Sequence, residues 1–401
     1  MVRRFWIAKE EEIKRGEVTD VYFLRTERIL EARGLADKQV VAEVTASRLP
    51  ENWEWGVLCG VEEVVRLLEG LPVTVYGMQE GTVFRPRDRR GYKVPVMVVE
   101  GPYGAFCRYE TPLLGLLCQA SGIATRAARI RKLAGDKLLL SFGIRRMHPG
   151  IAPMIDRAAY IGGVDAVSCV LSAKLLKKPA VGTMPHALII VVGDQIEAWR
   201  AFDEVVESEV PRIALVDTYF DEKVEAIMAA EALGERLWGV RLDTPSSRRG
   251  SYAEIIREVR WELDVRGFKH VKIVVSGGIT ERNIRELIEA GAEAFGVGTW
   301  LSNAPVVDFA LDLVEVEGQP AAKRGKLGGK KQVWRCWHCF LDELQPYEQP
   351  APTCPNCGRT MEPLLKPLLV NGEPKPLPSI DEIRAHVLNQ LKHPRVEVES
   401  K

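Results

Sequence analysis

Long apolar runs are absent from this sequence. A membrane-spanning helix needs roughly 20 consecutive, mostly apolar residues, and the longest apolar run, PHALIIVVG at residues 185–193, is far shorter. Residues 1–18 are charged almost throughout, so they lack the apolar segment of a secretory signal peptide. We therefore expect a cytoplasmic protein with no membrane partner.

An excess of charge of one sign is also absent. Lys and Arg together number 55, and Asp and Glu together also number 55. A chain without net basic charge, and without aromatic-rich segments on which bases could stack, is not typical of nucleic-acid-binding proteins. The 46% apolar and 27% charged residues are typical of globular proteins, and a length of 401 residues predicts two or three domains.

Disulfides are not expected, because the eight cysteines of a cytoplasmic protein would be reduced, metal-bound or catalytic. Four of them lie in apolar runs and are predicted to be core thiols: Cys59, Cys107, Cys118 and Cys169. The other four form the pairs CWHC and CPNC: Cys336, Cys339, Cys354 and Cys357. Two such pairs predict a tetrahedral zinc site, and four thiolates leave no open position, so this zinc should be structural. We expect His338, between two of the ligands, to be a bystander.

The expected elements divide the chain into three parts. Residues 1–112 mix helices with alternating strands. Residues 113–318 begin with a long helix and then alternate short apolar strands with helices. Residues 319–401 hold a basic, glycine-rich loop, the cysteine pairs and a final helix, for which Ser379 begins a capping box.

The alternation within residues 113–318 predicts a parallel sheet, because its strands are continuous apolar runs, as expected when both faces are covered. The expected strands are residues 136–142, 165–170, 179–183, 212–218, 238–243, 271–278 and 293–299. The expected helices include residues 153–161, 197–208, 220–233, 251–266 and 280–290. This pattern favours a compact or irregular β/α barrel, with a doubly wound open sheet as the alternative.

Candidate site residues follow these strands, at the carboxyl ends where such folds place their active sites. They are Phe142, Arg145, Arg146, His148, Thr183, His186, Asp217, Arg241 and Asp243. Arginine suits phosphate or carboxylate because its guanidinium group binds two oxygens at once, although a salt bridge to a neighbouring Asp is the alternative. Asp217 and Asp243 offer the oxygen ligands that Mg²⁺ prefers.

Two glycine turns end the last two strands, SGGI at 276–279 and GVGT at 296–299. Glycine lets a ligand approach the backbone closely, and successive amides at the start of a helix bind anions. Loops after the last strands of a barrel often share one phosphate. The pair therefore predicts a site for a sugar or nucleotide 5′-phosphate, although glycine is also the simplest turn residue. The residues expected to form it are Ser276, Gly277, Gly278, Gly296, Gly298 and Thr299.

Taken together, these segments resemble the nicotinate phosphoribosyltransferases, and most of all the shorter archaeal-type members. The resemblance covers nearly the whole chain and rests on residues 19–22, 141–168, 181–188, 216–222, 239–244, 274–279, 295–299 and 323–335. It implies the joining of nicotinate to phosphoribosyl pyrophosphate, which yields nicotinate mononucleotide and diphosphate in NAD salvage. It also implies an α/β fold in which an N-terminal α/β sandwich accompanies an irregular β/α barrel of the type II phosphoribosyltransferase kind. A zinc-ribbon-like segment would follow at the C-terminus.

The resemblance also implies roles for residues around the base. Phe142 and Tyr22 would sandwich the pyridine ring, with Tyr22 supplied by a neighbouring subunit, so a homo-dimer or larger assembly with a shared active site is expected. Arg145 and Arg146 would bind the nicotinate carboxylate or the diphosphate. Asp165 falls in the base-pocket region, which leaves nicotinamide and quinolinate open as alternative bases.

The remaining roles implied by the resemblance concern phosphate. Asp217, Arg241 and Asp243 would hold the ribose, the diphosphate and Mg²⁺, next to Thr183. His186 matches a histidine that ATP phosphorylates in many members, which would couple ATP hydrolysis to product formation; the alternative is a hydrogen bond to diphosphate. The basic loop would face phosphates or pack at a subunit edge: Lys323, Arg324, Lys326, Lys330 and Lys331. A nucleic-acid-binding zinc ribbon is the remote alternative.

Overall fold

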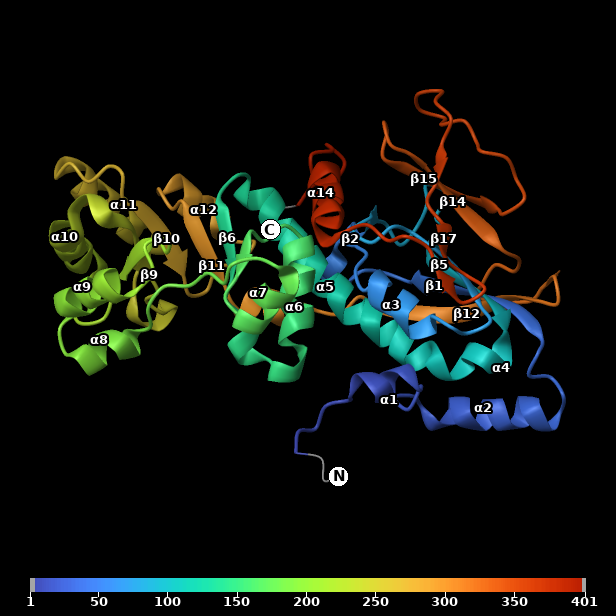
Figure 1. Cartoon of the computed structure of the whole chain (residues 1–401). Coiled ribbons are helices and arrows are strands. Elements are labelled where there is room, and N and C mark those ends of the chain that lie inside the picture. The colour runs from blue at the N-terminus through green and yellow to red at the C-terminus, as the bar shows by residue number, and fades with distance from the viewer. Residues whose placement is uncertain (1–3, 399–401) are drawn as a thin grey trace. The chain divides into compact units, whose positions relative to one another are not determined.

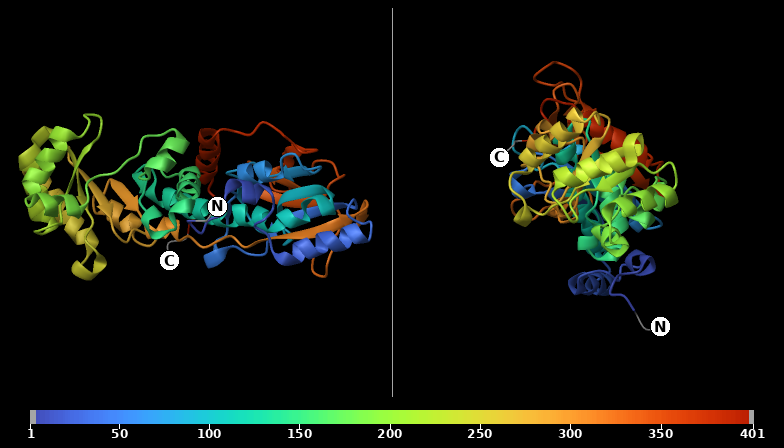
Figure 2. Two further views of the ribbon diagram at one scale, coloured as in Figure 1. Left: turned by 60° about the horizontal axis from the view of Figure 1, so that its bottom comes forward. Right: turned by 90° about the vertical axis from the view of Figure 1, so that its left-hand side faces the viewer.

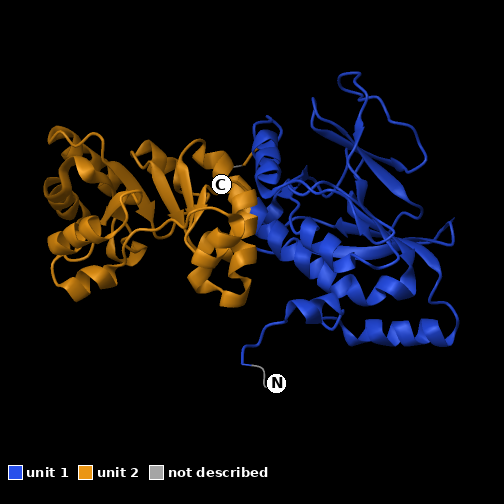
Figure 3. Cartoon of the chain, viewed as in Figure 1, with its two compact units in different colours: residues 1–125, 305–396 blue, residues 126–304, 397–401 orange. Residues whose placement is uncertain are grey.

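The computed structural model describes residues 4–398. Contacts within the chain define two compact units, which Figure 3 shows in different colours. Unit 1 comprises residues 1–125 and 305–396, and unit 2 comprises residues 126–304 and 397–401. Unit 1 thus contains the N-terminal part and most of the third part, which carries the cysteine pairs. The division into three domains that the sequence suggests stays a prediction.

Unit 1 is built on a seven-stranded antiparallel sheet in the order β13-β12-β1-β5-β3-β17-β18. Its strands are β1 (Gln39–Ala46), β3 (Thr74–Gly77), β5 (Pro95–Pro102), β12 (Phe309–Val316), β13 (Gln319–Pro320), β17 (Lys366–Val370) and β18 (Glu373–Pro374). A short pair lies apart from it, β2 (Gly56–Val57) and β4 (Val83–Phe84). Because β17 pairs with β3, the C-terminal part completes a sheet that the N-terminal part begins.

Helices complete unit 1 as a sandwich. They are α1 (Glu10–Lys14), α2 (Val21–Ala32), α3 (Val61–Leu68), α4 (Tyr103–Phe106), the first part of α5 (Glu110–Ala134), and α14 (Ile380–Leu391). One hydrophobic core joins side chains of β1, β5, α3 and α5. The predicted capping box of α14 is confirmed, since Ser379 and Glu382 each accept the other's backbone amide.

Three lysines of the basic loop form ion pairs with carboxylates of this sheet. Lys323 and Lys326 both pair with Asp312 of β12, and Lys331 Nζ lies 2.8 Å from Glu43 Oε1 of β1. Buried carboxylates are costly unless they are paired, so the loop stabilises the acids that the sheet buries. The structure thus differs from the predicted phosphate-facing loop: these three lysines are committed to ion pairs within unit 1.

Unit 2 contains a six-stranded sheet in which every pair is parallel, in the order β7-β6-β11-β10-β9-β8. The strands are β6 (Leu138–Ser141), β7 (Ala166–Val167), β8 (Arg212–Leu215), β9 (Leu237–Leu242), β10 (Lys272–Ser276) and β11 (Ala294–Val297). The last strand, β11, pairs with the first, β6, so the order is that of a barrel opened between β7 and β8. The barrel alternative is therefore confirmed as a curled half-barrel, and the doubly wound alternative is wrong.

Helices pack side by side around this sheet (Figures 1 and 2). They are α6 (Ala152–Ile161), α7 (Val170–Leu176), α8 (His186–Val192), α9 (Gln195–Val205), α10 (Glu222–Leu233), α11 (Tyr252–Val265), α12 (Ile284–Glu289) and α13 (Thr299–Ser302). Three of them begin at side chains that accept a backbone amide two or three residues into the helix: Asp194, Asp221 and Ser251. In the described part of the chain, no helix has the length and apolarity needed to cross a membrane.

Two expected elements of unit 2 differ in the structure. Residues 179–183 form no strand; the Val181 amide donates to the Val167 carbonyl, and the chain then runs extended into α8. This is the point at which the barrel is open. The helix expected at 280–290 begins only at Ile284, because residues 281–283 form a turn shaped by the Asn283 side chain.

Candidate functional site

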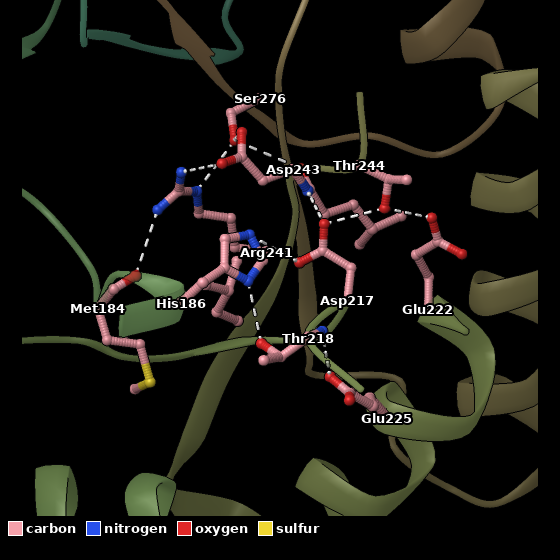
Figure 4. A network of polar contacts seen from close by, with 12 residues as sticks. Met184, His186, Asp217, Thr218, Glu222, Glu225, Arg241, Asp243, Thr244 and Ser276 are labelled. Carbon is pink, nitrogen blue, oxygen red and sulfur yellow. Dashed lines mark hydrogen bonds and ion pairs between the residues drawn. The ribbon is translucent and has the colours of Figure 1, made fainter. Parts of the chain in front are cut away.

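One arginine connects two strand ends and a loop in unit 2 (Figure 4). Arg241, near the end of β9, is only 9% exposed. Its Nε donates to Ser276 Oγ at 2.9 Å, and its Nη1 donates to Thr183 Oγ1 at 2.8 Å. Its Nη2 pairs with Asp243 Oδ2 at 2.9 Å. A single guanidinium therefore fixes the ends of β9 and β10 relative to the loop that precedes α8.

A buried aspartate lies beside this arginine network. Asp217 follows β8, and its Oδ2 accepts the Asp243 amide at 3.1 Å and the Thr244 hydroxyl at 2.9 Å. Its Oδ1 has no hydrogen-bond partner, although His186 Nε2 lies 3.7 Å away. Burial raises the pKa of the Asp217 carboxyl above its usual range. An unsatisfied buried carboxylate oxygen is the kind of atom that a bound cation would satisfy.

His186 is the first residue of α8 and is the more open member of this pair, with a side chain 38% exposed. Its Nδ1 lies 3.0 Å from Thr218 Oγ1, which leaves Nε2 directed toward Asp217. The loop carrying Thr218 is held by Glu225, whose carboxylate accepts three successive backbone amides of residues 218–220. His186 is thus oriented by a loop that a buried glutamate shapes.

Phe142 directly follows β6, and its ring lies 5.5 Å from the Arg241 guanidinium carbon. The strand behind the ring must carry glycine: a Cβ on Gly296 would lie 2.5 Å from Phe142 Cε2. Gly296 is paired within the sheet to both Leu140 and Ser276. Gly296 therefore lies directly against the Phe142 ring, where a side chain would not fit.

The other glycines form open turns. Gly277 and Gly278 both have left-handed backbones, with φ of 82° and 77°, which favours glycine. A Cβ on Gly277 would also lie 3.2 Å from the Asp243 carbonyl oxygen, so the turn passes close to the carboxylate cluster. The second turn, at Gly298, leads directly into the short α13, which starts at Thr299.

The remaining predicted residues are distributed differently. Arg145 and Arg146 are exposed in the turn just after Phe142. Asp165 lies at the amino end of β6, where its carboxylate pairs with Arg131 and accepts the Leu139 amide at 2.9 Å. The structure thus does not bring Asp165 to the strand ends that carry the site. His148, a candidate site residue, instead accepts the Gly150 amide at 3.0 Å and so caps the short helical turn of residues 149–151.

Tyr22 belongs to unit 1, on α2, and its side chain is 55% exposed. An exposed aromatic ring can contact another molecule, and the role of Tyr22 in the site of a neighbouring subunit stays a prediction.

Sequence reasoning missed several residues that shape the site. Tyr252 of α11 places its hydroxyl 2.8 Å from the Leu242 carbonyl and 2.9 Å from that of Ser276, so it joins the ends of β9 and β10. Burial raises the pKa of Tyr252. Thr244 also contacts Glu222 Oε1 at 2.5 Å. Together with Glu225, these residues lie in helical or loop runs where a polar side chain ordinarily indicates solvent, so no local signal distinguishes them.

The cysteine pairs form a second candidate site, in unit 1. They belong to a three-stranded sheet of β14 (Lys331–Cys336), β15 (Leu341–Pro346) and β16 (Glu362–Pro363). The four sulfur atoms of Cys336, Cys339, Cys354 and Cys357 all lie within 4.8 Å of one another. Four converging thiols on a small ribbon fit a tetrahedral metal such as zinc.

A parallel half-barrel with paired arginine and carboxylates and two glycine turns at its strand ends defines a class, the type II phosphoribosyltransferases. Two family models agree: "Quinolinate phosphoribosyl transferase, C-terminal domain" matches residues 123–312, and the corresponding N-terminal domain matches residues 20–121. A nicotinate phosphoribosyltransferase of Mycobacterium tuberculosis is 31% identical, over 94% of this chain and 90% of that protein. The chain belongs to the nicotinate phosphoribosyltransferase family.

Other relatives and solved structures agree with this assignment. A nicotinate phosphoribosyltransferase of Bacillus subtilis is 30% identical over 75% of this chain and 66% of that protein. A solved structure described as nicotinate-nucleotide pyrophosphorylase from Pyrococcus furiosus is 58% identical, with a TM-score of 0.95 over 99% of this chain and 100% of that chain. Human nicotinic acid phosphoribosyltransferase, at 24% identity and a TM-score of 0.72 over 93% of both chains, shares the fold.

Proposed function

We propose that this protein transfers the phosphoribosyl group of phosphoribosyl pyrophosphate to nicotinate, which gives nicotinate mononucleotide and diphosphate. The observation that carries the proposal is the cluster of Arg241, Asp243 and Asp217 beside the Gly277–Gly278 turn. The names of the curated relatives support it, because they are nicotinate phosphoribosyltransferases.

The proposed chemistry is mainly positional and electrostatic. As the bond between C1 of the ribose and the diphosphate breaks, positive charge develops on the ribose and negative charge on the leaving group. Arg241 is held by three partners and needs no reorganisation to offset the negative charge. The ring nitrogen of nicotinate attacks with its own lone pair, so the step requires no protein base or nucleophile. Phe142 would hold the ring flat, with Arg145 or Arg146 near the base carboxylate or the diphosphate.

Magnesium fits the carboxylate cluster. Asp217 Oδ1 is buried without a hydrogen-bond partner, and burial raises the pKa of the Asp217 carboxyl. The ionised carboxylate would therefore be more stable beside a bound cation than alone. Asp217 would be the principal protein ligand, because both oxygens of Asp243 are engaged by Arg241 and Ser276. Bound Mg²⁺ would supply charge neutralisation at the diphosphate.

The 5′-phosphate would lie at the glycine turns. Gly277, Gly278 and Gly298 present backbone without side chains, and Ser276 and Thr299 border the turns. Gly296 would act indirectly, through the space it leaves for Phe142.

ATP coupling would use His186. The residue is partly exposed, lies beside Asp217, and has Nε2 free of the Thr218 contact. We expect ATP to stimulate the wild-type protein and His186→Ala to lose that stimulation while keeping a basal rate. Full stimulation of His186→Ala would eliminate this role and favour a histidine that only hydrogen-bonds diphosphate.

The reaction is tested by measuring diphosphate release from phosphoribosyl pyrophosphate and Mg²⁺ with each base in turn. Nicotinate should support release, whereas nicotinamide and quinolinate should support far less. Release with quinolinate accompanied by CO₂ would transfer the protein to the quinolinate-using branch named by the family models. The nucleic-acid alternative loses support, because three lysines of the basic loop are committed to ion pairs.

A further inference from the structure

A buried arginine outside the catalytic cluster contacts the chain beyond both glycine turns. Arg126, on the unit 2 part of α5, has a side chain only 2% exposed. Its Nε lies 3.8 Å from Glu281 Oε1, and Glu281 is three residues beyond Gly278. Its guanidinium carbon lies 3.8 Å from the centre of the Trp300 ring, and Trp300 is two residues beyond Gly298. One side chain thus touches the segments that follow both turns.

The two contacts differ in kind. The Arg126–Glu281 pair is largely removed from water, and at 3.8 Å it is a long ion pair that restrains the loop through charge rather than through a short hydrogen bond. The flat guanidinium on the Trp300 ring is a close cation–π contact, which gains strength when desolvated. Each contact restrains the position of one loop, and sharing one guanidinium makes the two positions interdependent.

A neighbouring arginine offers a contrast. Arg129 lies on the same face of α5, one helical turn on, and its Nε pairs with Glu281 Oε2 at 2.8 Å. It therefore supports the first loop at least as firmly as Arg126 does. The contrast is at Trp300, whose ring contacts the guanidinium of Arg126.

We infer that Arg126 is a positioning residue that sets the spacing of the two glycine turns, so that both can bind one 5′-phosphate. The inference rests on the proposed function of those turns. Amides bind a phosphate well only when they converge on it, and a displacement of about 1 Å between the two turns would weaken the site by roughly 10- to 100-fold. Arg126 itself touches no substrate in this arrangement, because it lies behind the turns on α5.

The inference is tested with Arg126→Met, which keeps the bulk and removes the charge, and with Arg129→Met as the matched control. Binding of ribose 5-phosphate should weaken about tenfold in Arg126→Met and far less in Arg129→Met. In turnover assays, the KM for phosphoribosyl pyrophosphate should rise while the KM for nicotinate stays near the wild-type value. Arg126→Lys should recover part of the loss.

A second measurement guards against a variant that does not fold. Glu281→Gln and Trp300→Leu each remove one end of the contact while Arg126 remains. Their effects on ribose 5-phosphate binding should be less than additive in the wild-type background, because either change already breaks the link through Arg126, and additive once Arg126 is Met. Equal losses in Arg126→Met and Arg129→Met, or additive effects in both backgrounds, would overturn the inference. A wild-type protein that does not bind ribose 5-phosphate would instead overturn the proposed phosphate site.

Discussion

At the scale of single residues, the site contains charged groups that are not all paired. Arg241 is fully engaged by Ser276, Thr183 and Asp243, whereas Asp217 keeps one oxygen without a partner. Burying this oxygen without a partner lowers the stability of the free enzyme, whereas the substrate complex needs its negative charge. Two predictions follow from this balance and from the packing around Phe142.

Asp217→Asn should stabilise the free protein and abolish activity. Burial raises the Asp217 pKa, so the folded state holds its proton more tightly than the unfolded state. Stability is therefore present at low pH and is lost as pH rises through the raised pKa. The amide keeps an oxygen for the Asp243 and Thr244 bonds and removes the charge. At pH 7 we expect the Tm to rise by about 2–4 °C and kcat/KM to fall at least about 100-fold.

Comparing the two proteins at acid pH provides the control for this change. The difference in Tm between the variant and the wild type should shrink as pH falls below about 4, because the Asp217 carboxyl then takes up its proton in the unfolded as well as the folded wild type. A variant that is less stable at pH 7, or a difference that does not depend on pH, would contradict the raised pKa.

Gly296→Ala should disturb the base site through Phe142. The new methyl group would lie 2.5 Å from the ring, so the ring must move. We expect the KM for nicotinate to rise about tenfold, with a smaller change for phosphoribosyl pyrophosphate. Gly182→Ala is the matched control, since a Cβ there meets nothing within 4 Å. Equal changes in both KM values would argue against a ring-specific effect.

Sequence predicted the residues at strand ends well, because the apolar runs located the strands and the following polar residues were then placed by topology. Phe142, Arg241 and Asp243 meet in unit 2 as a result, and Thr183 joins them from residues 179–183, which form no strand. Asp165 was assigned through the resemblance and not through a strand end; it precedes β7, and its carboxylate pairs with Arg131. Glu225 could not be found, because its partners are backbone amides that only the folded loop presents.

At the scale of elements, the β14–β15–β16 ribbon is the part whose folding depends most on a ligand. Its local core consists largely of the cysteines themselves with Met361 and a few partly buried side chains. A metal bound by the four cysteines would add to the stability of so small a core. The ribbon also carries Lys331 to its pairing with Glu43, which would link a bound metal to the sheet of unit 1.

Removing the metal should therefore destabilise the protein without touching the strand ends of unit 2. Elemental analysis should find one zinc per chain in the wild type, and chelation should lower the Tm reversibly. Cys354→Ser should lose the zinc, whereas Cys169→Ser should retain it, because Cys169 lies outside the cluster at the start of α7. Zinc retained at full occupancy in Cys354→Ser would show that the four cysteines do not form the site.

At the scale of the whole molecule, the resemblance predicts that two copies of the chain share each site. Tyr22 lies on unit 1 and is exposed, whereas the residues proposed to contact phosphate and ribose lie in unit 2. If Tyr22 completes the site of a neighbouring subunit, then damage to Tyr22 and damage to Arg241 fall in different sites of a mixed dimer. One of the two sites in such a dimer would be intact.

Mixing two inactive variants tests this sharing. Tyr22→Ala and Arg241→Met, each weak alone, should recover about a quarter of wild-type activity when refolded together in equal amounts, since half of the dimers are mixed and half of their sites are intact. Asp217→Asn mixed with Arg241→Met should recover nothing like this if both residues belong to the same subunit's site. An absence of recovery in the first mixture would show that Tyr22 does not complete the site of a neighbouring subunit.

The most direct test of the central claim is a competition in one reaction vessel. Equal concentrations of nicotinate, nicotinamide and quinolinate are offered with limiting phosphoribosyl pyrophosphate and Mg²⁺, and the products are separated by mass spectrometry. We predict nicotinate mononucleotide formed from intact nicotinate as the main product, with unreacted quinolinate and no CO₂ from it. Nicotinamide mononucleotide as the main product, CO₂ from quinolinate, or no mononucleotide at all would contradict the account.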